Sequence, residues 1–282
     1  MHRLKAFCNA LLIGAFLAWV GGLSVAKAED VVREPAPPPP PLVELQAKEF
    51  SQRSDLVPTS GLQIRGEAIR EAALSYGARG GLAWRTFEIQ RRLAEHESTL
   101  VRTYDFKRLL ISAPSGLLIE PPVISEAERA VIVGSGGQDA AVADRVYRIG
   151  RTARIVTAGR DWRHYLERDW GVVEPPPEVL FPRDEIERIR WQEWVAKGWE
   201  EGVRQADDIF QADLDRLTAD FVGMVRYRQL LAQGIVTPTY AAQNDRGVTG
   251  GGRELRIGDR AVKITSNPQL TAHSEQWTPA QR

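Results

Sequence analysis

Residues 191–210 read WQEWVAKGWEEGVRQADDIF, a densely charged run that contains three tryptophans and two glycines. At ~100° of rotation per residue in a helix, the apolar and small residues of this run gather on one face and the charged residues on the opposite face. The apolar face consists of Trp191, Trp194, Val195, Gly198, Trp199, Gly202, Ala206 and Ile209. The run is therefore predicted to be an amphipathic helix.

The two glycines on this apolar face indicate unusually close packing. A glycine inside a helix costs ~1 kcal/mol relative to alanine, so Gly198 and Gly202 need a compensating gain. With Ala206 they form a groove that another backbone or a flat ring can approach closely, and burial of a tryptophan outweighs the helix cost. The packed surface is a core, a subunit interface or a small-ligand aromatic cage. The candidate packing or interface residues are Trp191, Trp194, Gly198, Trp199, Gly202, Ala206 and Ile209.

The N-terminal segment predicts export. It has a basic start, an apolar run from Ala10 to Val25, and the small-x-small motif at residues 26–28 that signal peptidase accepts. We expect residues 1–28 to be a cleaved signal peptide, with an uncleaved anchor as the alternative. The only cysteine, Cys8, precedes the apolar run. No lipoprotein acceptor cysteine is therefore found at the cleavage point, and the mature chain has neither a disulfide nor a cysteine metal ligand.

The composition of the mature chain indicates a folded, soluble body. Removal of the three basic residues of the signal leaves 34 of the 37 Lys and Arg against 37 Asp and Glu, a net charge near −3. This balance argues against nucleic acid as a direct partner, because a phosphate-binding surface needs a basic excess. Over the full sequence, eight tryptophans and a charged fraction of 26% are typical of a folded domain.

The chain is expected to have three parts after the signal. Residues 29–58 contain the proline run at 37–41, which predicts a disordered, extended tether. Residues 59–270 are expected to form the globular domain, with a break between sub-lobes near the prolines of 171–183. Residues 271–282 are expected to be a disordered tail.

The globular part is predicted to be α+β and predominantly helical, with a β-containing middle segment and a C-terminal β-hairpin. Apolar spacing predicts two helices separated by Gly77, Gly80 and Gly81, a further helix at 161–170, and a long helix from about residue 183 to 233. Short strands interrupted by prolines are expected within 108–157. Alternating apolar residues on both sides of Gly258-Asp259 predict a hairpin with a two-residue turn at those positions.

Two glycine-rich segments invite a nucleotide interpretation, and neither supports it. In AVIVGSGGQDAA, residues 130–141, the third glycine of the dinucleotide fingerprint is replaced by Asp139, and a strand pattern follows instead of a helix. A hairpin turn is the better interpretation. TGGGRE at 249–254 lacks the lysine and hydroxyl of a phosphate loop. No cofactor is therefore expected.

Candidates for catalysis or metal binding are also weak. The mature chain keeps three histidines with no metal-ligand spacing, and the pattern G-x-S-x-G is absent. His164 lies between Asp161 and Glu167 and is interpreted as a member of a surface salt bridge rather than a proton relay. The carboxylates of Asp207, Asp208, Asp213 and Asp215 are interpreted as solvated charges away from the apolar face. We therefore predict neither catalytic nor metal-ligating residues.

Several stretches in one order resemble the DotC family of type IVB secretion systems, which includes the TraI relatives of conjugation systems. They are LSYGARGGLAWR at 74–85, TYDFKRLL at 103–110, IEPPVISEA at 119–127, the long helix at 194–231, and then GVTGGGRELRI and ITSNPQL. None is chemically specific alone, but together they cover nearly the whole mature chain. Family members are typically lipoproteins, and this sequence departs from them in lacking the acceptor cysteine.

The resemblance implies a non-catalytic structural subunit of an outer-membrane core complex, located in the periplasm and associated with the outer membrane. Its implied partners are a small DotD-like lipoprotein and a DotH-like core subunit, whose assembly at the outer membrane it assists. Because no acceptor cysteine is found, membrane association is expected to be indirect. The alternatives are a periplasmic cell-wall-binding protein or hydrolase, and a small-ligand sensor with a deep aromatic pocket.

Overall fold

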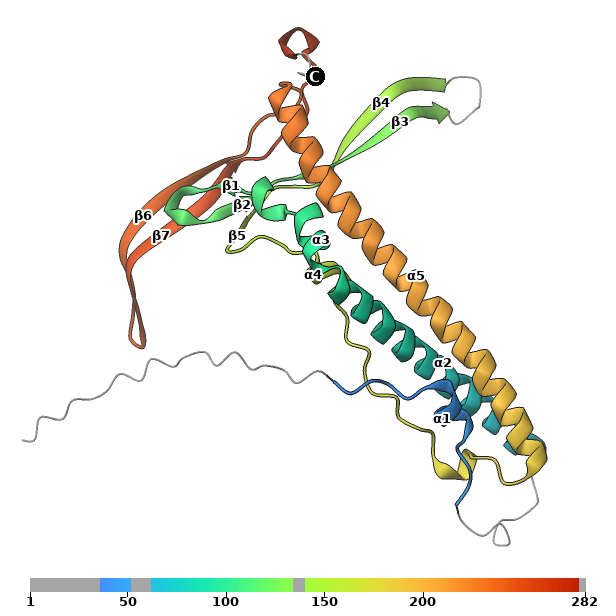
Figure 1. Cartoon of the computed structure of the whole chain (residues 1–282). Helices are drawn as coiled ribbons and strands as arrows, with labels where there is room; N and C mark the ends of the chain where they lie inside the picture. Colours follow the sequence, from blue (N-terminus) through green and yellow to red (C-terminus); the bar gives the residue numbers. More distant parts are fainter. Residues whose placement is uncertain (1–35, 52–61, 134–139, 279–282) are drawn as a thin grey trace, which may run out of the picture. The chain divides into compact units, whose positions relative to one another are not determined.

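The computed structural model shown in Figure 1 describes residues 36–51, 62–133 and 140–278. The chain divides into two units, Met1–Pro37 and Pro38–Arg282, and the fold described below is that of the second. The expected signal peptide at 1–28 and the expected turn within AVIVGSGGQDAA at 134–137 lie outside the described residues. Inside the segment expected to be a tether, α1 (Leu42–Gln46) buries Leu45 completely.

Two long helices lie side by side at the centre of the fold (Figure 1). They are α2 (Leu62–Glu95) and α5 (Glu185–Ala232). Arg65 pairs with Glu187 and Arg85 pairs with Asp207, and both pairs are separated by 122 residues in the sequence. Because the offset is the same in both pairs, the two helices run parallel and in the same direction.

The predicted long helix is confirmed as α5, and local chemistry sets both of its ends. The carboxylate of Asp184 accepts a hydrogen bond from the main-chain N–H of Glu187 at 2.8 Å, which is an N-cap. At the other end Gly234 has φ of 72°, the left-handed conformation that commonly terminates a helix.

The first helix is continuous, so the prediction that three glycines break it into two helices is wrong. A Cβ atom added to Gly77 would lie closer than 3.0 Å to the carbonyl oxygen of Val195, and one added to Gly81 would meet the carbonyl oxygen of Trp199 in the same way. The glycines are present because the backbone of α5 occupies this space. Tertiary packing offsets their low helix propensity.

The contact is reciprocal. On α5, a Cβ atom at Gly198 would lie closer than 3.0 Å to the carbonyl oxygen of Leu74, and one at Gly202 would meet that of Ala78. We call these four residues, Gly77, Gly81, Gly198 and Gly202, the glycine seam. Each helix contributes a G-x-x-x-G motif, the pattern that allows backbones to touch in membrane helix pairs. Within the described residues, no helix is long and apolar enough to cross a membrane.

The segment between the two long helices forms short elements. They are α3 (Glu97–Thr103), η2 (Phe106–Leu109), β1 (Ile111–Ser112), η3 (Pro114–Gly116), β2 (Leu118–Glu120), β3 (Val123–Val133), β4 (Ala140–Arg151), β5 (Arg154–Val156), α4 (Arg163–Leu166) and η4 (Glu178–Leu180). Strands β1, β2 and β5 form an antiparallel sheet in that order, and β3 pairs with β4 as a two-stranded ribbon. The predicted β-containing middle segment is therefore confirmed.

The helix expected at 161–170 is much shorter than predicted. It is confined to α4, and Glu167 already has extended backbone angles. The carbonyl oxygen of Leu166 accepts a hydrogen bond at 2.8 Å from the side chain of Gln90 on α2, a partner outside the helix. Arg168 then reaches the carboxylate of Asp213 on α5. After Leu166 the chain therefore contacts the two long helices and does not continue as a helix.

The C-terminal hairpin is confirmed, but its turn is not where the sequence suggested. Strands β6 (Tyr240–Gly251) and β7 (Glu254–Ser266) pair up to Gly251 opposite Glu254, so the two-residue turn is Gly252-Arg253. Gly258, expected in the turn, lies inside β7 with φ of 71° at a register shift. A bulge glycine in the left-handed region resembles a turn glycine in sequence, which explains the error. The chain then continues to η5 (Ser274–Gln276).

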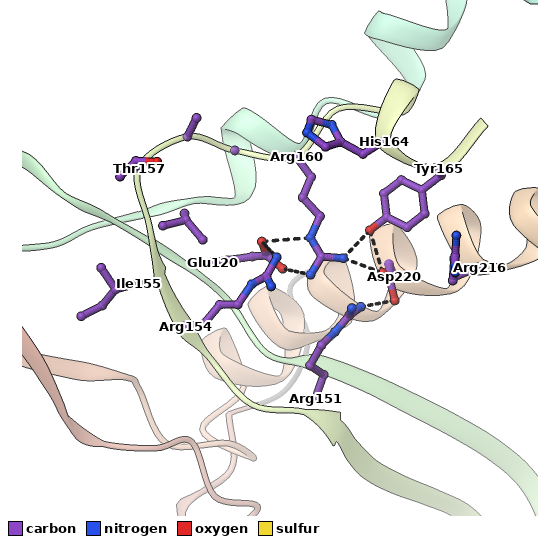
Figure 2. A pocket seen from close by; sticks show the side chains of 13 residues that line it. Glu120, Arg151, Arg154, Ile155, Thr157, Arg160, His164, Tyr165, Arg216 and Asp220 are labelled. Atoms are coloured by element: carbon purple, nitrogen blue, oxygen red, sulfur yellow. Dashed lines mark hydrogen bonds and ion pairs between the residues drawn. The ribbon is translucent and has the colours of Figure 1, made fainter. Parts of the chain in front are cut away.

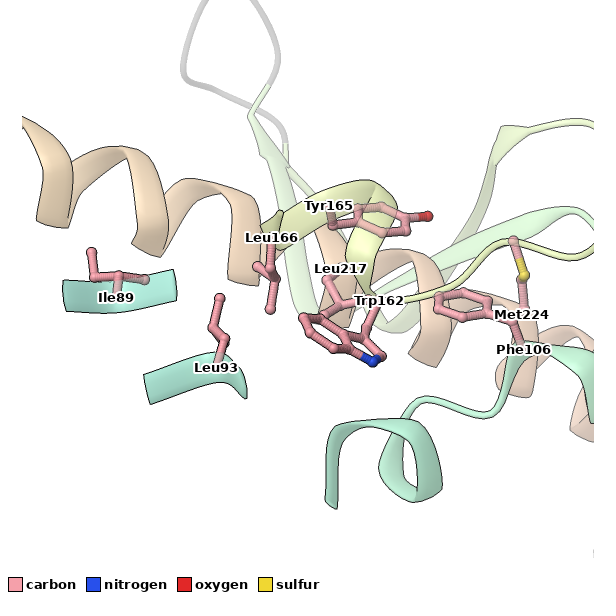
Figure 3. Close-up of a cluster of buried hydrophobic side chains, with 8 residues drawn as sticks. All are labelled: Ile89, Leu93, Phe106, Trp162, Tyr165, Leu166, Leu217 and Met224. Carbon is pink, nitrogen blue, oxygen red and sulfur yellow. The ribbon is translucent and has the colours of Figure 1, made fainter. Parts of the chain in front are cut away.

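Apolar side chains form three clusters along α5. The cluster around Trp191 includes Leu45, Ile69, Tyr76, Phe181 and Val195. The next, shown in Figure 3, joins α2, η2, α4 and α5 through Ile89, Leu93, Phe106, Trp162, Tyr165, Leu166, Leu217 and Met224. The third surrounds Tyr227 and includes Ile124, Leu230 and Val236. One face of α5 therefore connects the three clusters.

The glycine seam yields a matched pair of alanine substitutions. Gly202→Ala should destabilise the protein by about 1–3 kcal/mol, because its Cβ atom would overlap a main-chain carbonyl oxygen that is fixed by its helix. The larger side chain of Gly202→Leu should prevent folding. Gly66→Ala in α2 has nothing within 4 Å of the added Cβ and should stabilise by up to about 1 kcal/mol. Urea unfolding followed by circular dichroism measures both. Equal effects of the two alanines would contradict backbone contact at the seam.

Candidate functional site

The structure places the sequence-predicted packing residues on the face of α5 that meets α1 and α2. Trp191 is fully buried, and its Nε1–H donates to the carbonyl oxygen of Leu45 at 3.2 Å. Gly198, Gly202 and Ala206 are buried, and Gly198 and Gly202 belong to the glycine seam. The buried members of the set are thus in contact with other parts of the same chain.

The remaining three predicted residues are only partly buried. Trp194 packs at the edge of the Trp191 cluster, and Ile209 is half-buried. Trp199 lies across the seam, where its ring is 6.3 Å from the ring of Trp84 and contacts the space beside Gly80.

Of the four aspartates on α5 expected to be solvated, Asp208 and Asp215 are exposed, whereas Asp213 and Asp207 are paired with arginines. Asp213 was interpreted as a solvated charge, yet it is 6% exposed and accepts hydrogen bonds from Arg168 at 2.6 Å and Arg216 at 3.2 Å. Asp207 is also paired, with Arg85 at 2.7 Å. The available signal was helical spacing: Asp213, Leu217 and Asp220 recur at four and three residues and continue the buried stripe beyond Ala206.

Arg160 is the centre of a network that joins β2, α4 and α5 (Figure 2). Its guanidinium forms a two-pronged contact with Glu120, from Nε to Oε2 at 3.1 Å and from Nη2 to Oε1 at 2.8 Å. Its Nη1 donates to Asp220 at 3.0 Å and to the hydroxyl of Tyr165 at 2.7 Å. Glu120 is 3% exposed and Asp220 is 7% exposed, so both need these partners.

Two more arginines complete the neutralisation of the buried acids. Arg154 donates to Oε2 of Glu120 at 2.9 Å, and Arg151 forms an ion pair with Oδ1 of Asp220. The hydroxyl of Tyr165 donates to Oδ2 of Asp220 at 2.6 Å. Every oxygen of both carboxylates therefore accepts at least one hydrogen bond or ion pair.

The network shifts the pKa values of Asp220 and Tyr165. Burial acts to raise the pKa of Asp220, but hydrogen bonds from Arg151 and Tyr165 and the nearby positive charges outweigh it, so the pKa is lowered below 3.8. Burial, together with the hydrogen bond to Asp220, raises the pKa of Tyr165 to about 12. Asp220 therefore stays ionised and Tyr165 neutral at physiological pH, and neither is poised to exchange protons.

These charged side chains line a pocket of about 760 Å³. Its polar walls are Arg151, Arg154, Arg160, Arg216, His164, Tyr165, Glu120 and Asp220, and the chain from Ile155 to Gly159 forms the remaining wall. We call this the arginine pocket. His164 was expected in a salt bridge; instead its Nδ1 accepts a hydrogen bond from the main-chain N–H of Asp161 at 3.2 Å. Across the described ranges, no cluster of His, Cys, Asp and Glu could hold a metal ion.

The parallel helix pair, the two ribbons and the ion-pair network define an α+β chain held together by backbone contact and buried ion pairs. The chain belongs to the TraI family, described as "Type IV secretory system, conjugal DNA-protein transfer", which matches residues 63–279. The match covers most of the chain and confirms the family resemblance. No functionally curated protein matches the chain. The protein is therefore a component of a type IV secretion or conjugation system.

The buried carboxylate of Asp220 gives a stability test. Asp220→Asn should destabilise the protein by about 2–4 kcal/mol, because it leaves Arg151 and Arg160 facing each other without their counter-charge. Asp208→Asn, exposed on the same helix, should change stability by less than about 0.5 kcal/mol.

The Asp220→Asn variant also tests how the stability contribution of Asp220 depends on pH. Since the folded-state pKa of Asp220 is lowered from 3.8, its stabilising contribution is complete above that pH and is lost as the pH falls through the folded value. The stability difference between wild type and Asp220→Asn, measured by urea unfolding at several pH values, should thus be constant above pH about 4 and shrink below it. A difference that grew on acidification would contradict the ion-pair assignment.

Proposed function

We propose that this protein is a non-catalytic structural subunit of the outer-membrane core complex of a type IVB secretion or conjugation system. In this proposal it is exported by a cleaved signal peptide and acts in the periplasm. It assists outer-membrane assembly of a DotD-like lipoprotein and a DotH-like core subunit. Its association with the membrane is indirect, through those partners.

The observation that carries the proposal is the family match, which extends over residues 63–279. This range begins within α2 and includes α5 and both ribbons. A family defined by secretion-system components, matched from α2 to the end of the β6–β7 ribbon and beyond, supports a role in that machine. The commitment of every oxygen of Glu120 and Asp220 to arginines and a tyrosine supports a structural rather than catalytic role for these acids.

The β6–β7 ribbon supports a role in protein contact. In the described part of the chain its strands pair only with each other, and an isolated two-stranded ribbon is marginally stable in water. Val248 lies opposite Ile257, and Leu255 shares their face, so three apolar side chains form one strip that we call the ribbon strip. These side chains are 62%, 80% and 62% exposed, respectively. An apolar strip of this kind is stabilised when a partner subunit covers it.

Affinity purification from the cell envelope tests the proposal. The tagged protein should co-purify with secretion-system subunits, and Ile257→Asp should reduce their recovery at least several-fold because it places a charge in the ribbon strip. Arg256→Gln is the matched control: it alters the adjacent side chain, on the opposite face of β7, and should leave recovery unchanged. Recovery of the wild-type protein without any secretion-system subunit would refute the assignment.

A further inference from the structure

The arginine pocket contains more positive than negative charge. Four guanidinium groups, from Arg151, Arg154, Arg160 and Arg216, line it together with only two carboxylates, those of Glu120 and Asp220. These six groups therefore carry a net charge of two positive units. Asp213 forms ion pairs with both Arg216 and Arg168, and this neighbouring Asp213–Arg168 pair adds one charge of each sign, so the balance does not change.

The excess charge is on the two most exposed arginines. Arg160 is 15% exposed and is fully engaged with Glu120, Asp220 and Tyr165. Arg154 and Arg216 are 50% and 58% exposed. Among the described residues each of these two donates one hydrogen bond, to Glu120 and to Asp213, whereas a guanidinium has five N–H groups. Most of their donor capacity is available to an incoming anion.

The shape of the pocket favours a peptide over a single small anion. A pocket of about 760 Å³ falls within the size range of sites that hold ligands of many atoms. One wall is β5, which is the last strand of its sheet, pairs among the described strands with β2, and is also contacted by β7. An edge strand can align an extended peptide, and the partly buried side chains of Ile155 and Val156 provide apolar contact beside the arginines.

The chemistry of the lining favours carboxylates from a protein over a lipid headgroup. Arg160 already holds Glu120 in a two-pronged contact, the geometry in which a planar guanidinium matches a carboxylate. A surface that inserts into a bilayer presents exposed large apolar side chains, and within the described ranges none of the strongly exposed ones lines the pocket.

We infer that the arginine pocket binds an acidic peptide segment of a partner subunit, whose carboxylates are held by Arg154 and Arg216. The inference rests on the proposed function only for the source of the peptide. The net charge, the exposed donors and the edge strand are properties of this chain. Binding of this kind should be electrostatic and should weaken as salt is raised.

The test measures binding of a fluorescein-labelled peptide of alternating glutamate and valine to the purified full-length protein. We expect saturable binding, and weaker binding of a peptide with glutamine in place of each glutamate. Arg154→Gln and Arg216→Gln should each weaken binding about 5-fold, and together about 25-fold if their effects are independent. Both variants should fold, because Glu120 keeps Arg160 and Asp213 keeps Arg168. Circular dichroism checks this.

Two substitutions serve as matched controls. Arg204→Gln removes an arginine of α5 that, like Arg216, pairs with an acid three residues away. Arg256→Gln removes an exposed strand arginine that pairs with Glu254, as Arg154 is a strand arginine that pairs with Glu120. Neither lines the pocket, and both should leave binding unchanged. Equal binding of the glutamine peptide, or equal effects of the pocket and control variants, would overturn the inference.

Binding to vesicles that contain an anionic phospholipid, and displacement of the peptide by inorganic phosphate, are measured in the same way. Pocket-dependent binding to vesicles without binding to the peptide would overturn the inference in favour of a membrane surface. Displacement of the peptide by phosphate only at high concentration supports a peptide site. Wild-type protein that co-purifies with secretion subunits but does not bind the acidic peptide would refute this inference and leave the proposed function standing.

Discussion

The fold depends on the approach of two main chains at the glycine seam. A side chain at any of Gly77, Gly81, Gly198 or Gly202 would collide with a carbonyl group of the opposite helix. At this distance the helices exchange dispersion contacts along their backbones and allow weak Cα–H···O interactions. The same approach brings Trp199 and Trp84 within ring contact and lets Arg85 reach Asp207. The rest of the domain is arranged around this pair.

Beyond the seam, α5 changes the kind of contact that it makes. Its first half buries Trp191, Val195 and small residues, and its second half buries Asp213 and Asp220 between apolar side chains. Acids at these positions require cations, and the segment between the long helices supplies Arg151, Arg160 and Arg168. The short sheet and α4 are thus attached to α5 by charge as well as by the cluster of Leu217 and Met224. Their position, and that of the arginine pocket, follows from this attachment.

Periodicity and composition were sufficient to predict the fold class, the long helix α5 and the C-terminal hairpin. Periodicity and composition gave wrong predictions where the same residue type occurs in two different structural settings. Gly77 and Gly81 predict a helix break because helix propensity is local, whereas the backbone that makes glycine necessary there, at Val195 and Trp199, is 118 residues further along the chain. Gly258 was read as a turn because a bulge requires the same positive φ. Asp213 was read as solvated because its cation, Arg168, lies in a different segment. The pocket could not be predicted, since its residues come from β2, β4, β5, α4 and α5.

The parallel direction of α2 and α5 has a consequence for how the chain acquires its structure. Every contact of the seam joins residues more than a hundred positions apart, so it forms only after a large loop has closed. Alone, α2 is a poor helix, because four of its residues are glycines. It is best described as a segment ordered by α5, which has an N-cap of its own and fewer glycines for its length. Folding of this domain is therefore expected to be slow for its helix content, as high contact order dictates, with α2 docking late onto a helix that is already formed.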